Sequence, residues 1–336
     1  MKAPSFWYGS PGLRASLLAP LGAIYGAVGR RRMRRVAPTK VGPKVICVGN
    51  LVAGGTGKTP TAIGLAKRAA ELGTVAAFLS RGYGGRLTGP VRVDPSRHTA
   101  ADVGDEPLLL AAHGAVYVSR NRIAGARLAT ADGVDLLIMD DGFQNPFLHK
   151  DLSFLVIDAQ TGIGNGQIIP AGPLREYPQD GFRRADAIVL MGDRAPAPHL
   201  SQLISATGLP ILGARLEPSR DAEWLRGQTI VAFAGIGRPQ KFFNMLNRLG
   251  ADIVSRFAFP DHHRYDADDI MRLAEMAAAA EATLVTTTKD FARLPIEARQ
   301  MVELVEVEVV WSEPAELDRL LSNLLRGTDR DHNSRP

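Results

Sequence analysis

The sequence predicts an α/β protein, in which a mostly parallel sheet flanked by helices is followed by a second, smaller α/β domain. Short apolar runs alternate with helical patterns over residues 44–330, which favours parallel strands covered by helices. The proline-rich stretch 195–198 and the polar segment 217–227 interrupt this alternation. A chain of 336 residues has the length of two domains. We therefore expect an N-terminal segment over 1–40, a first domain over 41–218 and a second domain over 228–326.

The composition excludes several classes of protein. Hydrophobic residues make up 45% of the chain and charged residues 22%, which is too apolar for a disordered protein. No uninterrupted apolar stretch has the length of a membrane-spanning helix, so a polytopic membrane protein is excluded. Cys47 is the single cysteine, which excludes a disulfide framework and a cysteine-rich zinc site and favours a reducing compartment.

The N-terminal segment carries the positive charge of the chain. The net charge is +5, but residues 1–44 contain nine basic and no acidic residues, so the remainder sums to −4. Residues 15–29 are uncharged, too short to span a bilayer, and followed by the arginine-rich stretch 30–35. Large apolar side chains fall on one helical stripe, at Leu17, Leu21, Ile24, Tyr25 and Val28. The aromatic residues Phe6, Trp7 and Tyr8 precede this stripe.

This pattern is typical of a helix that lies on an anionic membrane surface. The alternative is a helix packed on its own domain with a solvated basic end. No recognised nucleic-acid motif accompanies the arginines, so we expect no nucleic-acid partner.

The alternating elements follow in order. In the first domain we expect strands at Val45–Val48, Val75–Leu79, Val116–Val118, Leu136–Met139, Phe154–Ile157 and Ala187–Leu190, with helices at 59–72, 106–113 and near 121–131. In the second we expect strands at Ile230–Phe233, Ile253–Phe257, Leu284–Thr287 and Val305–Val310, with helices near 239–249, 267–281 and 314–325. We expect the polar tail from Gly327 to be frayed.

A glycine-rich loop follows the first strand and has the features of a phosphate-binding P-loop. Its glycines let backbone N–H groups approach phosphate oxygens, its lysine reaches the β- and γ-phosphates, and its threonine hydroxyl serves Mg²⁺. The alternative is a plain turn between strand and helix. We expect this loop to bind ATP through Val52, Ala53, Gly54, Gly55, Thr56, Gly57, Lys58 and Thr59. Val52 replaces the usual first glycine, and Ala53 stands where the variant P-loops of the MinD and MobB branch often carry lysine.

A hydrophobic strand ends in two carboxylates, Asp140 and Asp141, at the sheet edge where the phosphate site is expected. One of them can hold Mg²⁺ together with Thr59. The alternative is a pair of turn or helix-capping aspartates.

Several other polar motifs have a functional interpretation and a purely structural one. Asp105 and Glu106 open a helix, where an aspartate is also an ordinary N-cap. The segment Asp261-His262-His263 fits a metal site, a proton relay or a polar loop. Arg81 and Tyr83 follow the second strand and can serve a ligand or form a turn. Arg175 and Glu176 end a glycine- and proline-rich loop of the kind that usually serves a site, whereas Lys289-Asp290 can merely cap a helix.

Together these motifs resemble one family, the tetraacyldisaccharide 4′-kinases (lipid A 4′-kinases) of Gram-negative bacteria. They occur in family order over nearly the whole chain: Val48-Gly49-Asn50-Leu51 through GGTGKTP, Ser80-Arg81-Gly82-Tyr83-Gly84, Val103-Gly104-Asp105-Glu106-Pro107, Asp140-Asp141-Gly142-Phe143-Gln144, Pro170-Ala171-Gly172-Pro173-Leu174-Arg175-Glu176, Ala234-Gly235-Ile236-Gly237, Asp261-His262-His263 and Thr288-Lys289-Asp290. The resemblance implies ATP-dependent phosphorylation of the 4′-hydroxyl of a lipid disaccharide 1-phosphate at the inner face of the inner membrane.

The resemblance also implies roles for individual residues. Lys58 and Thr59 would serve the γ-phosphate and Mg²⁺, and Asp105 would be the catalytic carboxylate, assisted by either His262 or His263. The metal environment would include Asp140, Asp141 and Glu176, and the substrate would meet Arg81, Tyr83, Glu106 and Arg175. A second hypothesis is a membrane-associated NTPase of the MinD and MobB branch that drives assembly or partitioning. The sequence leaves the oligomeric state open.

Overall fold

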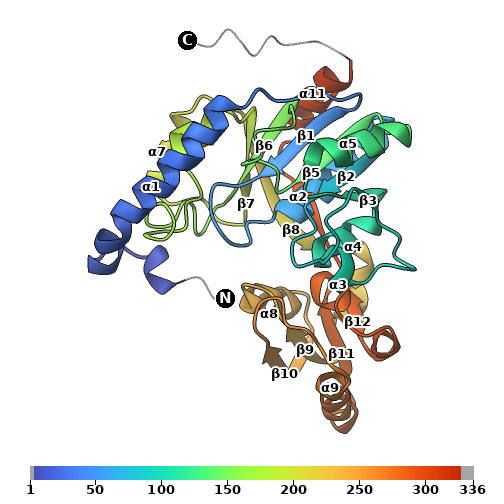
Figure 1. Cartoon of the computed structure of the whole chain (residues 1–336). Coiled ribbons are helices and arrows are strands. Elements are labelled where there is room, and N and C mark those ends of the chain that lie inside the picture. Colours follow the sequence, from blue (N-terminus) through green and yellow to red (C-terminus); the bar gives the residue numbers. More distant parts are fainter. Residues whose placement is uncertain (1–3, 327–336) are drawn as a thin grey trace.

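The computed structural model describes residues 4–326, which contain a nine-stranded and a four-stranded sheet (Figure 1). The polar tail from Gly327 lies outside these residues. The large sheet has the order β13-β8-β7-β6-β1-β5-β2-β4-β3. Its strands are β1 (Lys44–Gly49), β2 (Ala76–Ser80), β3 (Val91–Arg92), β4 (Val116–Val118), β5 (Leu136–Asp140), β6 (Leu152–Asp158), β7 (Ala187–Met191), β8 (Ile211–Pro218) and β13 (Val307–Trp311). The edge strands β3 and β13 pair antiparallel with their neighbours, and the other pairs are parallel.

Helices cover both faces of the large sheet. One face packs against α2 (Lys58–Glu71), α3 (Ala100–Val103), α4 (Asp105–Ala111) and α11 (Pro314–Leu325). The other packs against α5 (Arg122–Ala131), α6 (Pro178–Phe182) and α7 (Pro198–Ser205). Because both faces are covered, the central strands are apolar runs that are buried on both sides, as in β5 and β6. The predicted α/β class is confirmed.

The smaller sheet lies below the large one in Figure 1. Its order is β10-β9-β11-β12, with all recorded pairs parallel. The strands are β9 (Thr229–Ala234), β10 (Asp252–Ala258), β11 (Thr283–Thr287) and β12 (Glu303–Val305), and the helices are α8 (Pro239–Arg248), α9 (Ala267–Ala279) and α10 (Thr288–Phe291). Short 3₁₀ helices complete the chain: η1 (Ser5–Trp7), η2 (Arg220–Leu225) and η3 (Glu297–Met301).

The last predicted strand, Val305–Val310, is divided between the two sheets. β12 ends at Val305 in the small sheet, whereas β13 begins at Val307 and pairs antiparallel with β8 in the large sheet. Helix α11 then buries Leu317 and Leu321 in the core of the large domain. The chain therefore returns to the first domain, which differs from the expected second domain of 228–326. The apolar run predicted a strand correctly, but a run of apolar residues carries no information about which sheet it joins.

Strand β8 has no counterpart among the predicted elements. Its burial alternates at its start, and small and charged residues interrupt the apolar ones, so no continuous apolar run marks it.

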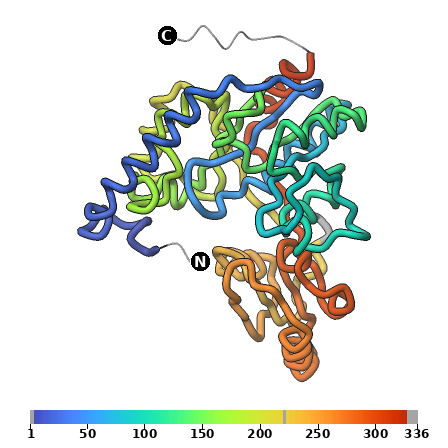
Figure 2. The backbone as a smooth tube through the Cα atoms, in the orientation of Figure 1, coloured from blue at the N-terminus to red at the C-terminus, as the bar shows by residue number. Residues whose placement is uncertain are grey.

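The N-terminal helix α1 (Leu13–Arg35) lies along the side of the large domain (Figures 1 and 2). It contacts the body of the protein through small residues. The fit is close: an added Cβ at Gly22 would lie 2.7 Å from the carbonyl oxygen of Ile168, and one at Gly26 would lie 2.8 Å from the Tyr177 ring. Its large apolar side chains point away from this contact and are exposed: Leu13, Leu17, Leu21, Ile24, Tyr25 and Val28. Among residues 4–326, no helix has both the length and the apolar character needed to cross a membrane.

Candidate functional site

The glycine-rich loop connects β1 to α2 at the centre of the large sheet. Gly57 has φ 95°, which favours glycine, and it leads directly into α2 at Lys58. The buried Asn50 holds the loop, because its Nδ2 donates to Thr56 Oγ1 at 3.0 Å and to the Gly54 carbonyl at 3.4 Å. The first-turn amides of α2 and the ammonium of Lys58 thereby form a site for a phosphate group.

The two residues before the glycines are held by the loop that precedes Arg175. Val52 is buried and forms a bridge to Leu174, and the Ala53 amide donates to the Pro173 carbonyl at 2.8 Å. These two residues brace the start of the phosphate loop through their backbone.

Asp140 ends β5, next to β1, and accepts a hydrogen bond from Thr59 Oγ1 at 2.9 Å. Its other oxygen, Oδ1, is buried and has no hydrogen-bond partner among the described residues. Burial, and then the charges of Glu106 and Asp141, raise the pKa of Asp140 despite the opposing charge of Lys58. A buried carboxylate oxygen without a partner, beside a threonine hydroxyl, fits a hard cation such as Mg²⁺.

Asp141 adopts φ 52° and contacts two cations. Its carboxylate lies 3.7 Å from Lys58 Nζ and 2.9 Å from Arg175 Nη1. Burial alone would raise the pKa of Asp141, but the charges of Lys58 and Arg175 outweigh it and lower the pKa. The structure thus brings together five predicted residues: Lys58, Thr59, Asp140, Asp141 and Arg175.

Glu176 occupies a supporting position that differs from the expected place among metal ligands. Its Oε1 accepts from Gln144 Nε2 at 2.9 Å and its Oε2 from Arg184 Nη2 at 2.6 Å. Gln144 also donates to the Asn50 carbonyl at 2.8 Å, so Glu176 buttresses the start of the P-loop. The sequence pattern cannot reveal this, because Gln144 and Asn50 come from segments distant from Glu176.

Asp105 and His262 meet across the two domains. Asp105 is the first residue of α4, His262 follows β10 with φ 60°, and the Asp105 Oδ2 lies 3.0 Å from His262 Nδ1. His263 instead contacts Asp269 at 2.7 Å and stacks on Phe259 within the second domain. The structure therefore selects His262 as the partner of Asp105, a choice that the sequence left open.

Arg293 is a site residue that sequence reasoning missed. Its side chain is only 3% exposed, and its Nε donates to Asp105 Oδ2 at 2.5 Å, while its Nη1 donates to the Gly235 carbonyl and to Asp290. Burial alone would raise the pKa of Asp105, but the hydrogen bond from His262 and the charge of Arg293 lower it. Arg293 follows α10, which ends at Phe291, in a turn where its amide donates to the Asp290 carbonyl at 2.9 Å, and no motif of the sequence indicated it.

The remaining predicted residues are Arg81, Tyr83 and Glu106. Tyr83 is 79% exposed, and its backbone lies against the start of α4, because an added Cβ at Gly104 would lie 2.4 Å from the Tyr83 carbonyl oxygen. The charge of Glu106 helps to raise the pKa of Asp140. The exposed Arg81 lies close enough to the buried Arg122 for its charge to affect the pKa of Arg122. Burial, and then the charge of Arg81, lower the pKa of Arg122 to about 10. No sequence motif indicated Arg122.

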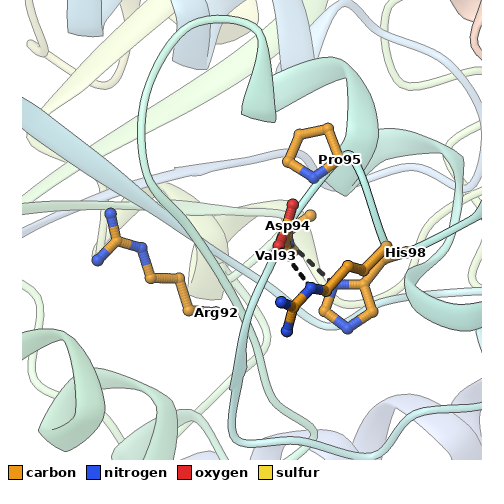
Figure 3. Close-up of a pocket in the computed structure, with 6 residues that line it drawn as sticks. Arg92, Val93, Asp94, Pro95 and His98 are labelled. Atoms are coloured by element: carbon orange, nitrogen blue, oxygen red, sulfur yellow. Dashed lines mark hydrogen bonds and ion pairs between the residues drawn. The ribbon is translucent and has the colours of Figure 1, made fainter.

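A separate hollow of about 510 Å³ follows the edge strand β3 (Figure 3). Its polar groups bind one another: the Asp94 amide donates to His98 Nδ1 at 2.9 Å, and Arg97 lies 3.5 Å from the Asp94 carboxylate. This hollow is a self-contained turn at the opposite end of the sheet order from β13, away from the central P-loop strand.

The fold and the site define a two-domain P-loop phosphotransferase. A family profile described as LpxK, tetraacyldisaccharide-1-P 4′-kinase, matches residues 14–326, and the chain belongs to this family. The family resemblance expected from the ordered motifs is confirmed.

Similar proteins cover almost the whole chain. The tetraacyldisaccharide 4′-kinase of Rhodospirillum centenum is 52% identical over 99% of both chains, and that of Rhodospirillum rubrum is 48% identical over 97% of this chain and 99% of its own. The crystal structure of the apo form of LpxK from Aquifex aeolicus in complex with ATP matches with a TM-score of 0.74 and 28% identity, over 93% of this chain and 99% of that chain.

Proposed function

We propose that this protein transfers the γ-phosphoryl group of ATP to the 4′-hydroxyl of a tetraacyldisaccharide 1-phosphate, a step of lipid A biosynthesis. The observation that carries the proposal is the 3.0 Å contact between Asp105 and His262, which joins the second domain to the P-loop domain of a chain that belongs to the 4′-kinase family. The family membership and the named relatives favour this activity over an NTPase that drives assembly or partitioning.

The chemistry follows from the positions of the side chains. The acceptor oxygen forms a bond to the γ-phosphorus while the bond from that phosphorus to the β–γ bridging oxygen breaks, and ADP leaves with the electron pair. His262 and Arg293 both contact Oδ2 of Asp105, so we assign Oδ1 to accept the proton of the sugar hydroxyl. Lys58 stabilises the negative charge that develops between the β- and γ-phosphates.

We include Mg²⁺ in the proposal, held by Thr59 and Asp140. The support is the buried, unpartnered Oδ1 of Asp140 beside the Thr59 hydroxyl. When bound, the ion supplies neutralisation of phosphate charge. Glu176 serves this site indirectly, through Gln144 and the P-loop backbone.

We further propose that α1 attaches the protein peripherally to the cytoplasmic face of the inner membrane. The support is the division of α1 into a glycine face against the body and an exposed apolar face, with Leu17 71% and Ile24 62% exposed. At the end of α1 a basic hollow of about 520 Å³, suited to anionic headgroups, is lined by Ala27, Val28, Arg30, Arg31, Arg34, Arg35 and Tyr177.

A transfer assay with γ-labelled ATP and the disaccharide 1-phosphate acceptor tests the activity. We expect acceptor-dependent label transfer, with little ATP consumed when the acceptor is absent. Lys58→Ala should lower the turnover number by about 10²- to 10³-fold, because alanine provides no positive charge for the transferring phosphoryl group. Equal ATP hydrolysis with and without acceptor, and no labelled lipid, would instead favour the NTPase hypothesis.

Sedimentation with anionic vesicles tests the attachment. We expect the wild-type protein to pellet with vesicles at low salt and to be released as ionic strength rises. The double variant Leu17→Glu/Ile24→Glu should lose binding, whereas Val75→Glu, which alters an apolar side chain that is 81% exposed just before β2, should bind like wild type. If both variants bound the vesicles as the wild-type protein does, another surface would contact the membrane.

A further inference from the structure

Two cations of the second domain converge on one buried carboxylate of the first. Asp158 ends β6 and is 2% exposed. Its Oδ2 accepts from Arg238 Nη2 at 2.5 Å and from Lys241 Nζ at 3.0 Å. Asp158 carries one negative charge and its two partners carry two positive charges. One positive charge is therefore left without a neutralising partner in this cluster.

Arg238 also contacts the P-loop itself. Its Nη2 donates to the Gly55 carbonyl at 3.2 Å, between the two domains. The N-terminal segment also reaches the P-loop at this point. The Tyr8 hydroxyl lies so near Gly54 that an added Cβ there would be 3.6 Å from it. The excess positive charge therefore lies beside the glycines that receive the phosphate chain of a nucleotide.

The loop that carries Arg238 is joined to the loop that carries His262. The His262 amide donates to the Gly235 carbonyl at 3.1 Å, and an added Cβ at Gly237 would lie 3.6 Å from Asp261 Oδ2. These two loops form one wall of the second domain that faces the P-loop. The transferred phosphoryl group must face Asp105 and His262, so the phosphate that lies toward this wall is the γ-phosphate.

We propose that Arg238 binds the γ-phosphate of ATP and so couples the second domain to the presence of that phosphate. A guanidinium has five N–H donors and forms paired hydrogen bonds with phosphate oxygens. Arg238 uses the Gly55 carbonyl and Asp158 as partners here, and the terminal phosphate replaces the Gly55 carbonyl, while Lys241 keeps Asp158 neutralised. This inference rests on the proposed binding of ATP at the P-loop.

Calorimetric titration of the full-length protein with Mg²⁺ and either a non-hydrolysable ATP analogue or ADP tests the proposal. Arg238→Ala should weaken binding of the ATP analogue by about tenfold or more, because a charge-assisted hydrogen bond is lost, and should change ADP binding less than about threefold. The matched control is Lys241→Ala, which removes a cation from the same Asp158 oxygen, three residues further along the chain in α8. It should leave the ratio of the two affinities unchanged.

Four results would overturn the inference. Equal weakening of ATP analogue and ADP by Arg238→Ala would make Arg238 a support of the loop, and equal effects of the two alanine variants would make it only an interdomain ion pair. Binding by Arg238→Ala that matches wild type for both nucleotides would exclude any phosphate contact. A wild-type protein that binds neither nucleotide would overturn the proposed function as well, which separates that failure from a failure specific to Arg238.

Discussion

At the scale of single residues, adjacent histidines have unlike environments. His262 lies between the domains, where its Nδ1 contacts Asp105 and its Nε2 lies 3.4 Å from Lys289 Nζ. His263 faces the opposite way, into a cluster with Asp269, Phe259 and Tyr265. His262 has φ 60° within a turn in which the His263 amide donates to the Pro260 carbonyl at 3.0 Å, so the two neighbouring side chains contact different parts of the molecule.

We predict that Asp105→Ala lowers the turnover number by about 10²- to 10⁴-fold, because a general base is lost, with little change in ATP affinity. His262→Ala should give a strong effect of the same kind, and the double variant should be less than additive, because the two residues act together. His263→Ala should mainly lower the melting temperature. Steady-state kinetics and thermal unfolding of the four proteins check this. A larger turnover defect for His263→Ala than for His262→Ala would contradict the assignment.

At the scale of elements, α1 shows how small residues determine the orientation of an amphipathic helix. Gly22 and Gly26, one turn apart, permit close contact with Ile168 and Tyr177, so the large apolar stripe is left on the outer face. The N-terminal end is held as well, since Trp7 Nε1 donates to the Pro170 carbonyl at 3.1 Å. Helix α1 therefore packs on its own domain, as the alternative interpretation expects, but it does so through its small residues, and the apolar stripe remains exposed.

We predict that Gly22→Leu destabilises the docked helix by about 1–3 kcal/mol, because a Cβ would lie 2.7 Å from a backbone oxygen that cannot move freely. Gly29→Leu is the matched control in the same helix, where an added Cβ meets nothing within 4 Å. Limited proteolysis and thermal unfolding should show earlier cleavage of the N-terminal segment and a lower melting temperature for Gly22→Leu only. Identical behaviour of the two variants would show that the glycine face is not a packing surface.

At the scale of the whole molecule, polar contacts join the domains beside the nucleotide site. The chain crosses between the sheets after β8 and again between β12 and β13. Between these crossings, the contacts of Asp105 with His262 and Arg293, and of Asp158 with Arg238 and Lys241, link the second domain to the first. The second domain therefore meets the first largely through charged groups that lie beside the P-loop and Asp105.

We predict a specific pH dependence for the Asp158 contact. Burial alone would raise the pKa of Asp158, but the hydrogen bonds and charges of Arg238 and Lys241 lower it well below its usual range. The stabilisation is therefore complete above the unfolded value of about 3.9 and is lost as pH falls toward the folded value. The difference in melting temperature between wild type and Asp158→Asn should be constant from about pH 8 to 5 and shrink below about pH 4. A difference that grows on acidification would contradict this ion pairing.

The sequence by itself determined the parts whose physics is local. The phosphate loop could be predicted because glycines, a lysine and a threonine in that order define backbone and charge within one turn. Buried strands such as β5 could be predicted because parallel strands are apolar on both faces. The uncharged, arginine-bounded segment likewise predicted α1, and the ordered motifs identified the family.

Only the tertiary structure decided which distant groups meet. Asp105 and His262 are 157 positions apart, and nothing in either local pattern distinguishes His262 from His263. The same holds for the placement of Glu176 behind the P-loop, for Arg238 at Gly55 and for the return of β13 to the large sheet. These contacts depend on how the two sheets and their connecting loops pack against each other. A short stretch of sequence does not contain that geometry, so it cannot identify the side-chain partners across the interface.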